Sequence, residues 1–537
     1  MWVAVCNGLA ADMLARLRTA AVFGVEACQV DVEVDVSFGM PRFTMVGLPD
    51  VGVRESRDRV RSAIRNSGFA FPAHRITVNL APADVRKAGA AFDLPIALGI
   101  LAAEGIVECR DVAVLMVLGE LSLDGTIHPA RGVLPIAVAA RRAGMKALLL
   151  PAANASEAAI VEGLDVYPVS SLADAVRILN DTASIPARSS PPPAVFREVA
   201  DLADIRGQLL ARRALEIACA GGHNLLAVGP PGSGKTMMAR RVPGILPPMT
   251  FDEAVEVTSV HSVAGLLPPG AGLVAQRPFR APHHTISDIA LVGGGAQPRP
   301  GEVSLAHNGV LFLDEMLEFS RHVLEVLRQP LEERAVTVAR AARTSTFPAH
   351  FMLVGAMNPC PCGYLGDARR ECRCTPQQVA RYRDRLSGPL RDRLDLLVDV
   401  PALPPDILTT DARGEPSADV RARVVVARSC PRDRFETAGI RTNAELTPSL
   451  AARHCALDRA CIRLMQSSIT RFGLSARGYD RVRAVARTIA DLEGATAIDA
   501  AQSTADSLSA TLDQMEVVED LRRTLRNIRD VNKLDSN

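Results

Sequence analysis

The sequence predicts a multidomain α/β protein, and three observations lead to this prediction. The chain has 537 residues, 48% of them hydrophobic, which is too long for one core and implies two or three domains. Its first third alternates strand-like and helix-like segments, and its middle holds short apolar strands around a glycine-rich loop. Its last part has the apolar periodicity of helices. We therefore expect an αβ domain, a parallel α/β core and a helical region, in this order.

The N-terminal region, residues 1–182, is expected to fold as an αβ sandwich. Residues 30–38, VDVEVDVSF, and residues 75–82, RITVNLAP, alternate apolar and polar side chains as half-buried strands do. Residues 51–66 combine an apolar helical face with five arginines, which most simply form a solvated face. Residues 93–103, DLPIALGILAA, are typical of a buried helix.

A proline- and serine-rich stretch predicts the first domain boundary. Residues 183–198 contain SSPPPAV and are expected to form an extended linker. An α/β core is predicted for residues 199–402, and a C-terminal helical lid and tail for residues 403–537. Within that last region, residues 446–473 repeat apolar side chains at three- and four-residue spacing, as a helix does.

Charge and cysteine content restrict the class of protein. With 61 basic and 60 acidic residues, the chain has no global field that would attract nucleic acid, so such a partner would need local basic patches. There is no apolar run of membrane-spanning length and no signal-peptide pattern at the N-terminus, where Met13 is an alternative start. Eleven cysteines, an odd number, argue against a disulfide framework and favour a cytoplasmic location.

Residues 229–236, GPPGSGKT, follow the P-loop pattern between a predicted strand at 224–229 and a predicted helix at 235–242. The glycines let backbone N–H groups turn toward phosphate oxygens, and the helix start presents its positive end to them. We expect Lys235 to neutralise phosphate charge and Thr236 to hold Mg²⁺. The expected nucleotide-binding residues are Gly229, Pro230, Pro231, Gly232, Ser233, Gly234, Lys235, Thr236, Met237 and Asp314.

Two further strands are predicted to complete an ATP-hydrolysing site. Residues 310–315, VLFLDE, form a buried strand that delivers Asp314 and Glu315 to its carboxyl end. Asp314 is expected to support the magnesium ion together with Thr236, and Glu315 to polarise the attacking water. Residues 351–358 end in Asn358, which would reach the γ-phosphate as the residue called sensor 1; the alternative is that it only begins the next turn.

Several long motifs resemble one known family. In the core these are RPGEVSLAHNGVLFLDEMLEF (299–319), VLEVLRQPLE (323–332), AMNPCPCGYLGD (356–367) and RLSGPLRDRLDL (385–396). The N-terminal region adds FTMVGLPDVGVRESRDRVRSAIRNSGF, and GLSARGYDRVRAVARTIADL lies near the end. Together, over roughly residues 14–495, the chain resembles the magnesium-chelatase-like AAA+ ATPases of the YifB/ComM type.

The resemblance implies a homo-hexameric ring in which ATP lies between neighbouring subunits. It assigns the arginine finger, which acts on the neighbour's nucleotide, to Arg393, and the sensor 2 arginine of the lid to Arg477. Arg391 stands where the family usually has an apolar residue, so the choice between Arg391 and Arg393 stays open. Beyond residue 495 the chain departs from the family, and an additional helix is expected there.

The resemblance also likens the first domain to the proteolytic domain of Lon-type proteases, a ribosomal S5-like fold. This raises the alternative of an ATP-dependent protease with a serine–lysine dyad. The matching segments, residues 90–99 and 131–140, contain no serine and no lysine, respectively, and Ser122 and Lys146 stand elsewhere. We therefore expect a Lon-like domain without the protease dyad.

Four cysteines within residues 360–374 form a C-x-C, nine-residue, C-x-C arrangement: Cys360, Cys362, Cys372 and Cys374. Four thiolates this close in the chain can reach one tetrahedral Zn²⁺ ion. The alternative is four reduced thiols that bind no metal. The remaining cysteines are expected at ordinary apolar positions: Cys6, Cys28, Cys109, Cys219, Cys430, Cys455 and Cys461.

The resemblance implies a DNA motor, because ComM-type members act as helicases that promote branch migration during recombination of incoming DNA. Single- or branched-strand DNA is then the expected partner, contacted by two basic segments at the ring's pore, residues 278–287 and a hairpin at 333–346. Their basic residues are Arg280, His283, His284, Arg334, Arg340 and Arg343. The alternatives are solvated charge on these segments, and a protein-remodelling or metal-chelatase-like ATPase that acts on a partner protein.

Overall fold

The computed structural model describes residues 14–83, 87, 90–108, 114–181, 199–268, 270–295, 298–340, 343–367, 369–409, 413–435, 439–472 and 475–498. The predicted linker at 183–198, Met13 and the tail beyond residue 498 lie outside these residues. The chain divides into two compact units. The first comprises Met1–Val195, Ala254–Val274 and Ala339–Phe347, and the second comprises Phe196–Glu253, Ala275–Val338 and Pro348–Asn537.

A seven-stranded sheet in the order β3-β4-β2-β1-β5-β8-β9 forms the first unit. Its strands are β1 (Leu14–Phe23), β2 (Glu26–Ser37), β3 (Arg42–Val46), β4 (Arg75–Ala81), β5 (Leu115–Val117), β8 (Ala147–Pro151) and β9 (Asp165–Val169). The long strands β1 and β2 pair antiparallel, as do β2 and β4, and the other four pairs are parallel. Along β2, residues Val30, Val32, Val34 and Val36 are buried and alternate with more exposed residues, which confirms the predicted strand.

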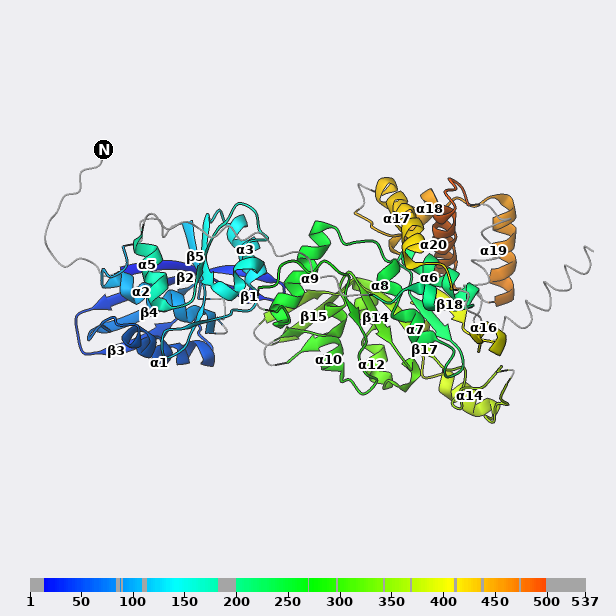
Figure 1. The fold of residues 1–537 in the computed structure, drawn as a ribbon, viewed down its shortest axis with the longest axis horizontal. Coiled ribbons are helices and arrows are strands. Elements are labelled where there is room, and N and C mark those ends of the chain that lie inside the picture. Colours follow the sequence, from blue (N-terminus) through cyan, green and yellow to red (C-terminus); the bar gives the residue numbers. More distant parts are fainter. Residues whose placement is uncertain are drawn as a thin grey trace, which may run out of the picture. The chain divides into compact units, whose positions relative to one another are not determined.

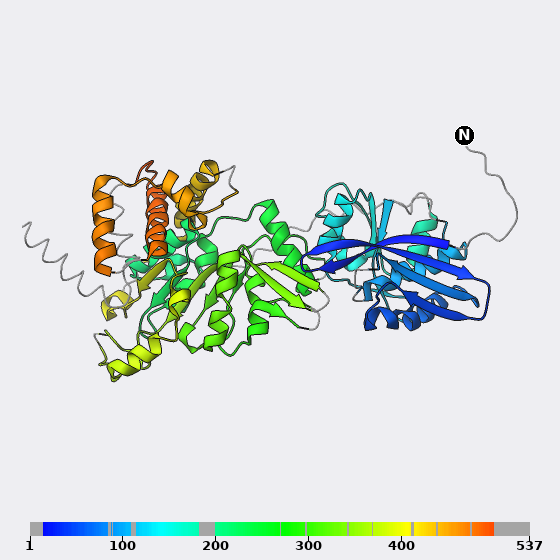
Figure 2. The same ribbon diagram turned by 180° about the vertical axis from the view of Figure 1, so that it is seen from behind.

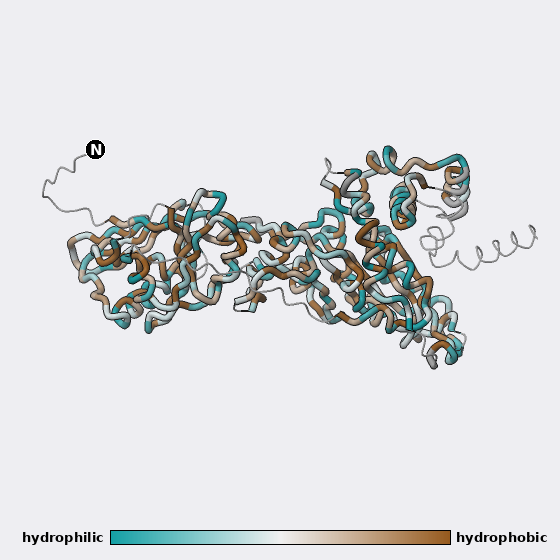
Figure 3. Tube along the Cα trace, turned by 45° about the horizontal axis from the view of Figure 1, so that its top comes forward, coloured by the Kyte–Doolittle hydropathy of each residue, from teal (hydrophilic) through white to brown (hydrophobic). Residues whose placement is uncertain are grey.

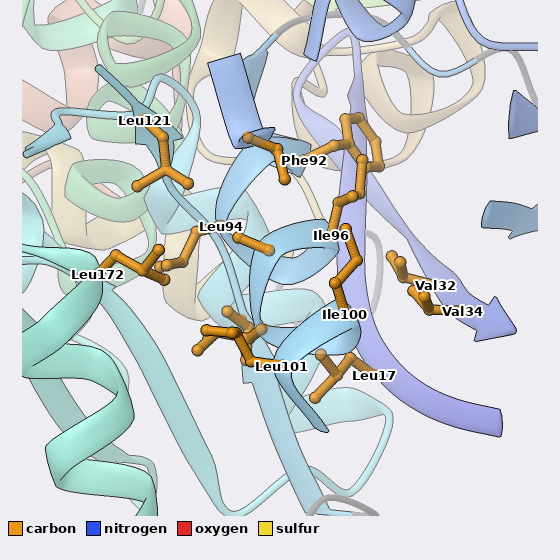
Figure 4. Close-up of a cluster of buried hydrophobic side chains, with 14 of the residues drawn as sticks. Leu17, Val32, Val34, Phe92, Leu94, Ile96, Ile100, Leu101, Leu121 and Leu172 are labelled. Carbon is orange, nitrogen blue, oxygen red and sulfur yellow. The ribbon is translucent and has the colours of Figure 1, made fainter. Parts of the chain in front are cut away.

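Helices pack on this sheet and close its core. α1 (Val51–Asn66) begins at Asp50, whose carboxylate accepts a hydrogen bond from the backbone N–H of Val53. α2 (Asp93–Ala103) has the predicted bounds and is buried from Asp93 to Leu101. Figure 4 shows Ile96 and Ile100 of α2 close to Leu17, Val32 and Val34 of the two long strands. α3 (Val133–Arg142) and α5 (Leu172–Asn180) complete the main helices of this unit.

Residues 254–274 come from the middle of the chain but belong to the first unit. They include most of α9 (Phe251–Ala264). The Ser262 hydroxyl donates a hydrogen bond to the buried Glu157 carboxylate, the Ser262 carbonyl accepts one from Gly132 N–H, and Gly270 N–H donates to Ala153 O. Burial raises the pKa of Glu157, against the opposing effect of its hydrogen bonds. Nothing in the sequence indicated this grouping.

A five-stranded parallel sheet in the order β11-β14-β17-β10-β18 forms the centre of the second unit. The strands are β10 (Leu225–Val228), β11 (Phe279–Arg280), β14 (Val310–Leu313), β17 (Met352–Met357) and β18 (Leu396–Asp399). Apolar side chains of β10, β14 and β17 enter two separate buried clusters, because both faces of the sheet are covered by other elements. Figure 1 shows β14, β17 and β18 among the helices of this unit. The predicted parallel α/β core is confirmed.

The helix that follows the P-loop is shorter than predicted. α7 (Lys235–Ala239) ends before a turn, and α8 (Val242–Ile245) follows as a separate short helix. The prediction of one helix over residues 235–242 is therefore wrong. Pro243 explains the break, since proline has no N–H to donate to the carbonyl of Ala239 and its ring would collide with that carbonyl.

Helices dominate the chain after residue 405, as predicted: α16 (Pro405–Thr409), α17 (Ser417–Arg434), α18 (Pro448–His454), α19 (Arg459–Phe472) and α20 (Ala476–Leu492). Figures 1 and 2 show α17, α18 and α20, in yellow to red, beside one another. The helical spacing of apolar residues over 446–473 corresponds to two helices, α18 and α19. The chain is extended at Leu457, which bridges to Ile498, and the Asp458 carboxylate then accepts from Cys461 N–H at 2.6 Å and starts α19.

Apolar and polar stretches alternate along the described chain (Figure 3). Within the described ranges, none of the helices has both the length and the apolar character needed to cross a lipid bilayer.

Candidate nucleotide site

The P-loop connects β10 to α7 in a conformation that depends on glycine. Gly232 and Gly234 have φ angles of 76° and 95°, a region that side chains disfavour. A Cβ added at either residue would meet no atom within 4 Å, so the space over the loop is open. Between them, the buried hydroxyl of Ser233 has no hydrogen-bond partner in the described structure. An open loop with an unused buried hydroxyl fits an oxygen-rich ligand such as a phosphate chain.

The side chain of Lys235 forms hydrogen bonds with the backbone of the P-loop. Its Nζ atom donates to Gly229 O at 2.6 Å and to Pro230 O at 2.9 Å, and it lies 3.4 Å from Asn358 Oδ1. Burial lowers the pKa of Lys235 to about 8, although the nearby carboxylates of Asp314 and Glu315 favour the charged form. Among the described residues no carboxylate forms an ion pair with this half-buried ammonium group, which is therefore suited to receive an anionic phosphate.

Thr236, in α7, and Asp314, directly after β14, are in contact. The Thr236 hydroxyl donates to Asp314 Oδ2 at 2.7 Å, which pairs the two oxygens predicted to support magnesium. The backbone N–H of Glu315 donates to the other carboxylate oxygen of Asp314 at 3.0 Å. Carboxylate and hydroxyl oxygens are the ligands that Mg²⁺ prefers, so the pair fits the ion.

Glu315 lies at the carboxyl end of β14 in a strained conformation. Its φ angle of 48° is in the left-handed region, which typically costs about 1 kcal/mol or more for a residue with a side chain. This conformation leaves the side chain 58% exposed, with Oε2 3.9 Å from Nδ1 of His284. His284 was predicted only as a basic residue of a pore segment, and its position beside Glu315 was not foreseen.

The strand order explains how these groups come together. β17, which ends before Asn358, lies between β10 and β14 in the sheet. The P-loop, Asn358 and Asp314 therefore follow the carboxyl ends of three neighbouring parallel strands. Gln208, which the sequence did not single out, joins them: its Nε2 atom donates to Pro401 O at 2.7 Å and to the P-loop carbonyl Ser233 O at 3.4 Å.

The two arginines assigned by resemblance share one carboxylate. Arg393 forms an ion pair with Glu332 Oε1, and Arg477 donates to the same oxygen at 2.9 Å. Arg393 is 9% exposed and Arg477 is 64% exposed. The hydrogen bond from Arg393, followed by the charges of both arginines, lowers the pKa of Glu332. Arg391, at the end of α15 (Gly388–Arg391), is exposed.

The four clustered cysteines are close in space as well as in sequence. The Sγ atoms of Cys360, Cys362, Cys372 and Cys374 all lie within 4.8 Å of one another. Of the other cysteines, Cys219, Cys455 and Cys461 are buried as predicted, Cys28 and Cys430 are only half-buried, and Cys6 and Cys109 lie outside the described residues.

In each of the two basic segments, one arginine forms an ion pair with a glutamate of the same chain. Arg280 forms a bidentate ion pair with Glu302, at 2.6 and 2.7 Å, and Arg334 pairs with Glu445 at 3.1 Å. The predicted hairpin is present as β15 (Ala335–Arg340) and β16 (Arg343–Pro348), which pair with each other. The side chains of its tip residues, Arg340 and Arg343, lie outside what the structure describes.

Three parts of the chain match families of magnesium chelatase. Residues 201–408 match "Magnesium chelatase, subunit ChlI", residues 32–154 match "Subunit ChlI of Mg-chelatase", and residues 414–508 match "Magnesium chelatase, subunit ChlI C-terminal". The first match contains the whole P-loop, both Asp314 and Glu315, and the cysteine cluster.

Curated relatives extend the likeness over almost the whole chain. "Competence protein ComM" of Haemophilus influenzae is 46% identical over 488 residues, which cover 90% of this chain and 94% of the relative. "Uncharacterized protein YifB" of Escherichia coli is 43% identical over 89% of this chain and 94% of its own length. "Magnesium-chelatase 38 kDa subunit" of Rhodobacter capsulatus is 26% identical over 51% of this chain and 75% of its own length. The chain therefore belongs to the YifB/ComM-type family of magnesium-chelatase-like AAA+ ATPases.

Proposed function

We propose that this protein is an ATP-driven ring motor that acts on single- or branched-strand DNA. The observation that carries the proposal is the assembly of Lys235, Thr236, Asp314 and Asn358 at the carboxyl ends of neighbouring parallel strands. In a protein similar to "Competence protein ComM", this arrangement supports a motor whose hydrolysis is coupled to DNA.

The residues of the site take distinct roles in this proposal. The P-loop from Gly229 to Thr236, with Met237, binds the triphosphate, and Lys235 neutralises its charge. Thr236 and Asp314 hold Mg²⁺, which when bound stabilises the negative charge of the phosphate oxygens. Glu315, exposed at the strand end, orients and polarises the attacking water. Asn358, next to the Lys235 ammonium group, binds the γ-phosphate and so reports its presence.

The ring is proposed to supply the remaining charges. We infer a homo-hexamer in which the nucleotide of one subunit meets an arginine of the next, Arg393 or its neighbour Arg391, while Arg477 acts from the lid of the nucleotide-binding subunit. Desolvated guanidinium groups stabilise the charge that develops during phosphoryl transfer. In the single chain, Arg393 and Arg477 share the one carboxylate of Glu332, so assembly and nucleotide binding would exchange this carboxylate for phosphate oxygens.

The first unit is proposed to have the Lon-like fold without peptidase chemistry. The segment that would hold the nucleophile, residues 90–99, begins α2, where Asp93 is buried and bonded to Arg59 Nε at 2.7 Å. A fully buried carboxylate with a bonded guanidinium group is a structural ion pair. The segment that would supply the lysine, residues 131–140, forms most of α3 and contains no lysine.

A protein partner is the second candidate, because the chain also resembles "Magnesium-chelatase 38 kDa subunit" over half its length. The two candidates differ in what stimulates hydrolysis. We expect forked or four-way-junction DNA to raise the ATPase rate of the purified protein several-fold, with strand displacement in the presence of ATP. A rate that does not respond to any DNA structure, together with no strand movement, would reject the DNA motor and favour a partner protein.

Two variants make this assay specific to the proposed site. Lys235→Ala removes the charge that receives the phosphates, so binding of ATP should weaken markedly. Glu315→Gln keeps the shape of the side chain but cannot polarise water, so ATP should stay bound without turnover, with a rate reduced about a hundredfold or more. Continued turnover by Glu315→Gln would contradict the role assigned to this residue.

A further inference from the structure

The cysteine loop, residues 360–374, gathers its four thiols around one point. The Sγ atoms of Cys360 and Cys362 are 3.3 Å apart, and both are near Cys372 Sγ, at 3.7 and 3.6 Å, respectively. With Cys374 included, no two of the four sulfur atoms are more than 4.8 Å apart. A tetrahedral zinc site with Zn–S bonds of about 2.3 Å requires sulfur atoms about 3.8 Å apart. The observed spacing suits one shared ion better than two separate disulfides, whose sulfur atoms would be about 2 Å apart.

Apart from the thiols, the loop is held by turns and by polar contacts of exposed residues, such as the hydrogen bond from Arg370 to the Tyr364 hydroxyl at 2.8 Å. Within its described part it contains no helix or strand, half of its residues are exposed, and most of the others are only half-buried. Its leucine, Leu365, is 38% exposed, so the loop cannot depend on a hydrophobic core of its own. Small segments without a core commonly take their stability from a bound metal or a disulfide. Turns at Gly363 and Gly366 bring the two C-x-C pairs together, and Cys374 N–H donates to Cys372 Sγ.

We infer that the four cysteines of this loop bind one Zn²⁺ ion, and that the ion holds the loop against the nucleotide site. The P-loop contact is made by Gly363: a Cβ added there would lie 2.7 Å from Cδ of Pro231, so the loop packs directly on the P-loop. On its other side the loop begins two residues after Asn358, whose Oδ1 atom meets Lys235 Nζ. The zinc site thus fixes the position of Asn358 relative to Pro231 of the P-loop.

The helix that follows the loop completes this attachment. The N-cap of α14 (Pro376–Arg383) is Thr375, directly after Cys374, and it forms a capping box with Gln378. At its end, Arg383 Nε donates to Pro359 O at 3.4 Å, next to Asn358. The end of α14 therefore lies beside the residue that follows Asn358. Four Zn–S bonds in the middle of the segment from Asn358 to Arg383 would hold its conformation.

Metal content tests the site directly. We expect full-length protein purified without added metal to contain about one zinc ion per chain, with X-ray absorption showing sulfur neighbours at about 2.3 Å. Cys362→Ser and Cys372→Ser should each lose most of the zinc, whereas Cys430→Ser, a half-buried cysteine of α17, should retain it. If a cysteine variant does not fold, titration of the wild type with an organomercurial should release zinc as four thiols react. No zinc, iron instead of zinc, or disulfides in place of thiols would overturn the inference.

A pair of glycine variants tests the coupling to the nucleotide site. Gly363 and Gly366 have similar φ angles of 84° and 79°, so alanine strains the backbone comparably at both. Only at Gly363 does the new Cβ meet the P-loop; at Gly366 it meets no atom within 4 Å. We expect both variants to keep zinc, and Gly363→Ala to bind a fluorescent ATP analogue at least about fivefold more weakly than Gly366→Ala. Equal affinities would overturn the coupling. Neither measurement involves DNA, so these results stand apart from the test of the motor.

Discussion

At the scale of single residues, Lys235 has the most unusual environment in the nucleotide site. Its amino group is mostly surrounded by protein, its pKa falls to about 8, and its hydrogen bonds go to neutral carbonyl and amide oxygens. Burial removes part of the water around the ammonium group, and no described carboxylate forms an ion pair with it. Bound phosphate supplies that anion and must raise the pKa of Lys235 again. Nucleotide binding and protonation of this lysine are therefore linked.

This linkage predicts how ATP affinity depends on pH. Below about pH 8 the lysine is already protonated, so binding needs no proton and the affinity should be flat. Above pH 8 each binding event must take up a proton, and the affinity should fall by up to about tenfold per pH unit, or about 1.4 kcal/mol. Titration of a fluorescent ATP analogue from about pH 7.5 to about pH 9.5, above the range in which phosphate groups titrate, measures the effect.

Lys235→Arg is the matched control for this pH dependence. A guanidinium group stays charged across the whole range, so the affinity of the variant should not change with pH, whatever its absolute value. A wild-type affinity that is equally flat up to pH 9.5 would contradict the link between Lys235 and the bound phosphates.

At the scale of secondary structure, α20 is held by a buried charge network. The Asp491 carboxylate, 2% exposed, accepts from Arg487 Nε at 3.0 Å, Arg434 at 2.7 Å and Asn443 at 2.8 Å. Arg487 is 1% exposed and also donates to Ala495 O and Thr496 O. Charges this deeply buried are tolerated only while each keeps its partners. The network ties the last described helix to α17 and to the segment before α18.

Asp491→Asn should open this helix. Removing one charge leaves two buried or half-buried arginines without their counter-ion, which typically costs about 3 kcal/mol or more. Hydrogen exchange of the α20 amides should therefore speed up by about two orders of magnitude, while the amides of β10 change little. Glu493→Gln is the control: its side chain is 35% exposed and lies 4.0 Å from Arg213, so the variant should change stability by less than about 0.5 kcal/mol. Equal exchange in both variants would contradict the network's role.

Local sequence patterns correctly predicted the P-loop and the three strands that lead into the nucleotide site. The strands before the P-loop, Asp314 and Asn358 are short apolar runs bounded by polar residues, and β10, β14 and β17 lie within a residue or so of the predicted bounds. The glycine pattern indicated the P-loop itself. The prediction of one helix over 235–242 failed because Pro243 interrupts a regular pattern and ends α7 early. The boundary between α18 and α19, before Asp458, was not visible in the apolar spacing.

Contacts between distant residues could not be predicted in this way. Glu332 lies in a family motif but was given no role from the sequence, yet it pairs with two arginines 61 and 145 positions away. Gln208 and His284 reach the site only because the sheet brings separate loops to one edge. Such pairings depend on the tertiary arrangement of the strands, which a single sequence does not contain.

At the scale of the whole molecule, the proposed ring makes each active site the product of two chains. An arginine that acts in trans can be supplied by a subunit whose own site is inactive. In the single chain, the side chains of Arg391 and Arg393 differ in how available they are for this role. Arg391 is exposed at the end of α15, whereas Arg393 must first leave Glu332.

Subunit mixing identifies the finger. Arg393→Ala and Glu315→Gln should each be nearly inactive alone, because each lacks one half of the site. In a one-to-one mixture, about a quarter of interfaces would combine an intact Glu315 with an intact arginine, so activity should return to roughly that fraction of the wild-type rate. Rescue of Arg391→Ala instead would assign the finger to Arg391. If mixing with Glu315→Gln rescues neither arginine variant, the proposal that two subunits share each active site is wrong.

The division of the chain has a practical consequence for protein engineering. The polypeptide passes from one compact unit to the other after residues 195, 253, 274, 338 and 347, so neither unit is one continuous segment. A truncation that starts at residue 199 keeps Ser262 and Gly270 but discards Glu157, Gly132 and Ala153, their hydrogen-bonding partners. The buried side chains of Val257 and Val260 lie in the same segment, which belongs to the first unit. A fragment cut at the proline-rich stretch should therefore aggregate or be digested at residues 254–274, and a soluble fragment will need that segment replaced by a short polar connection.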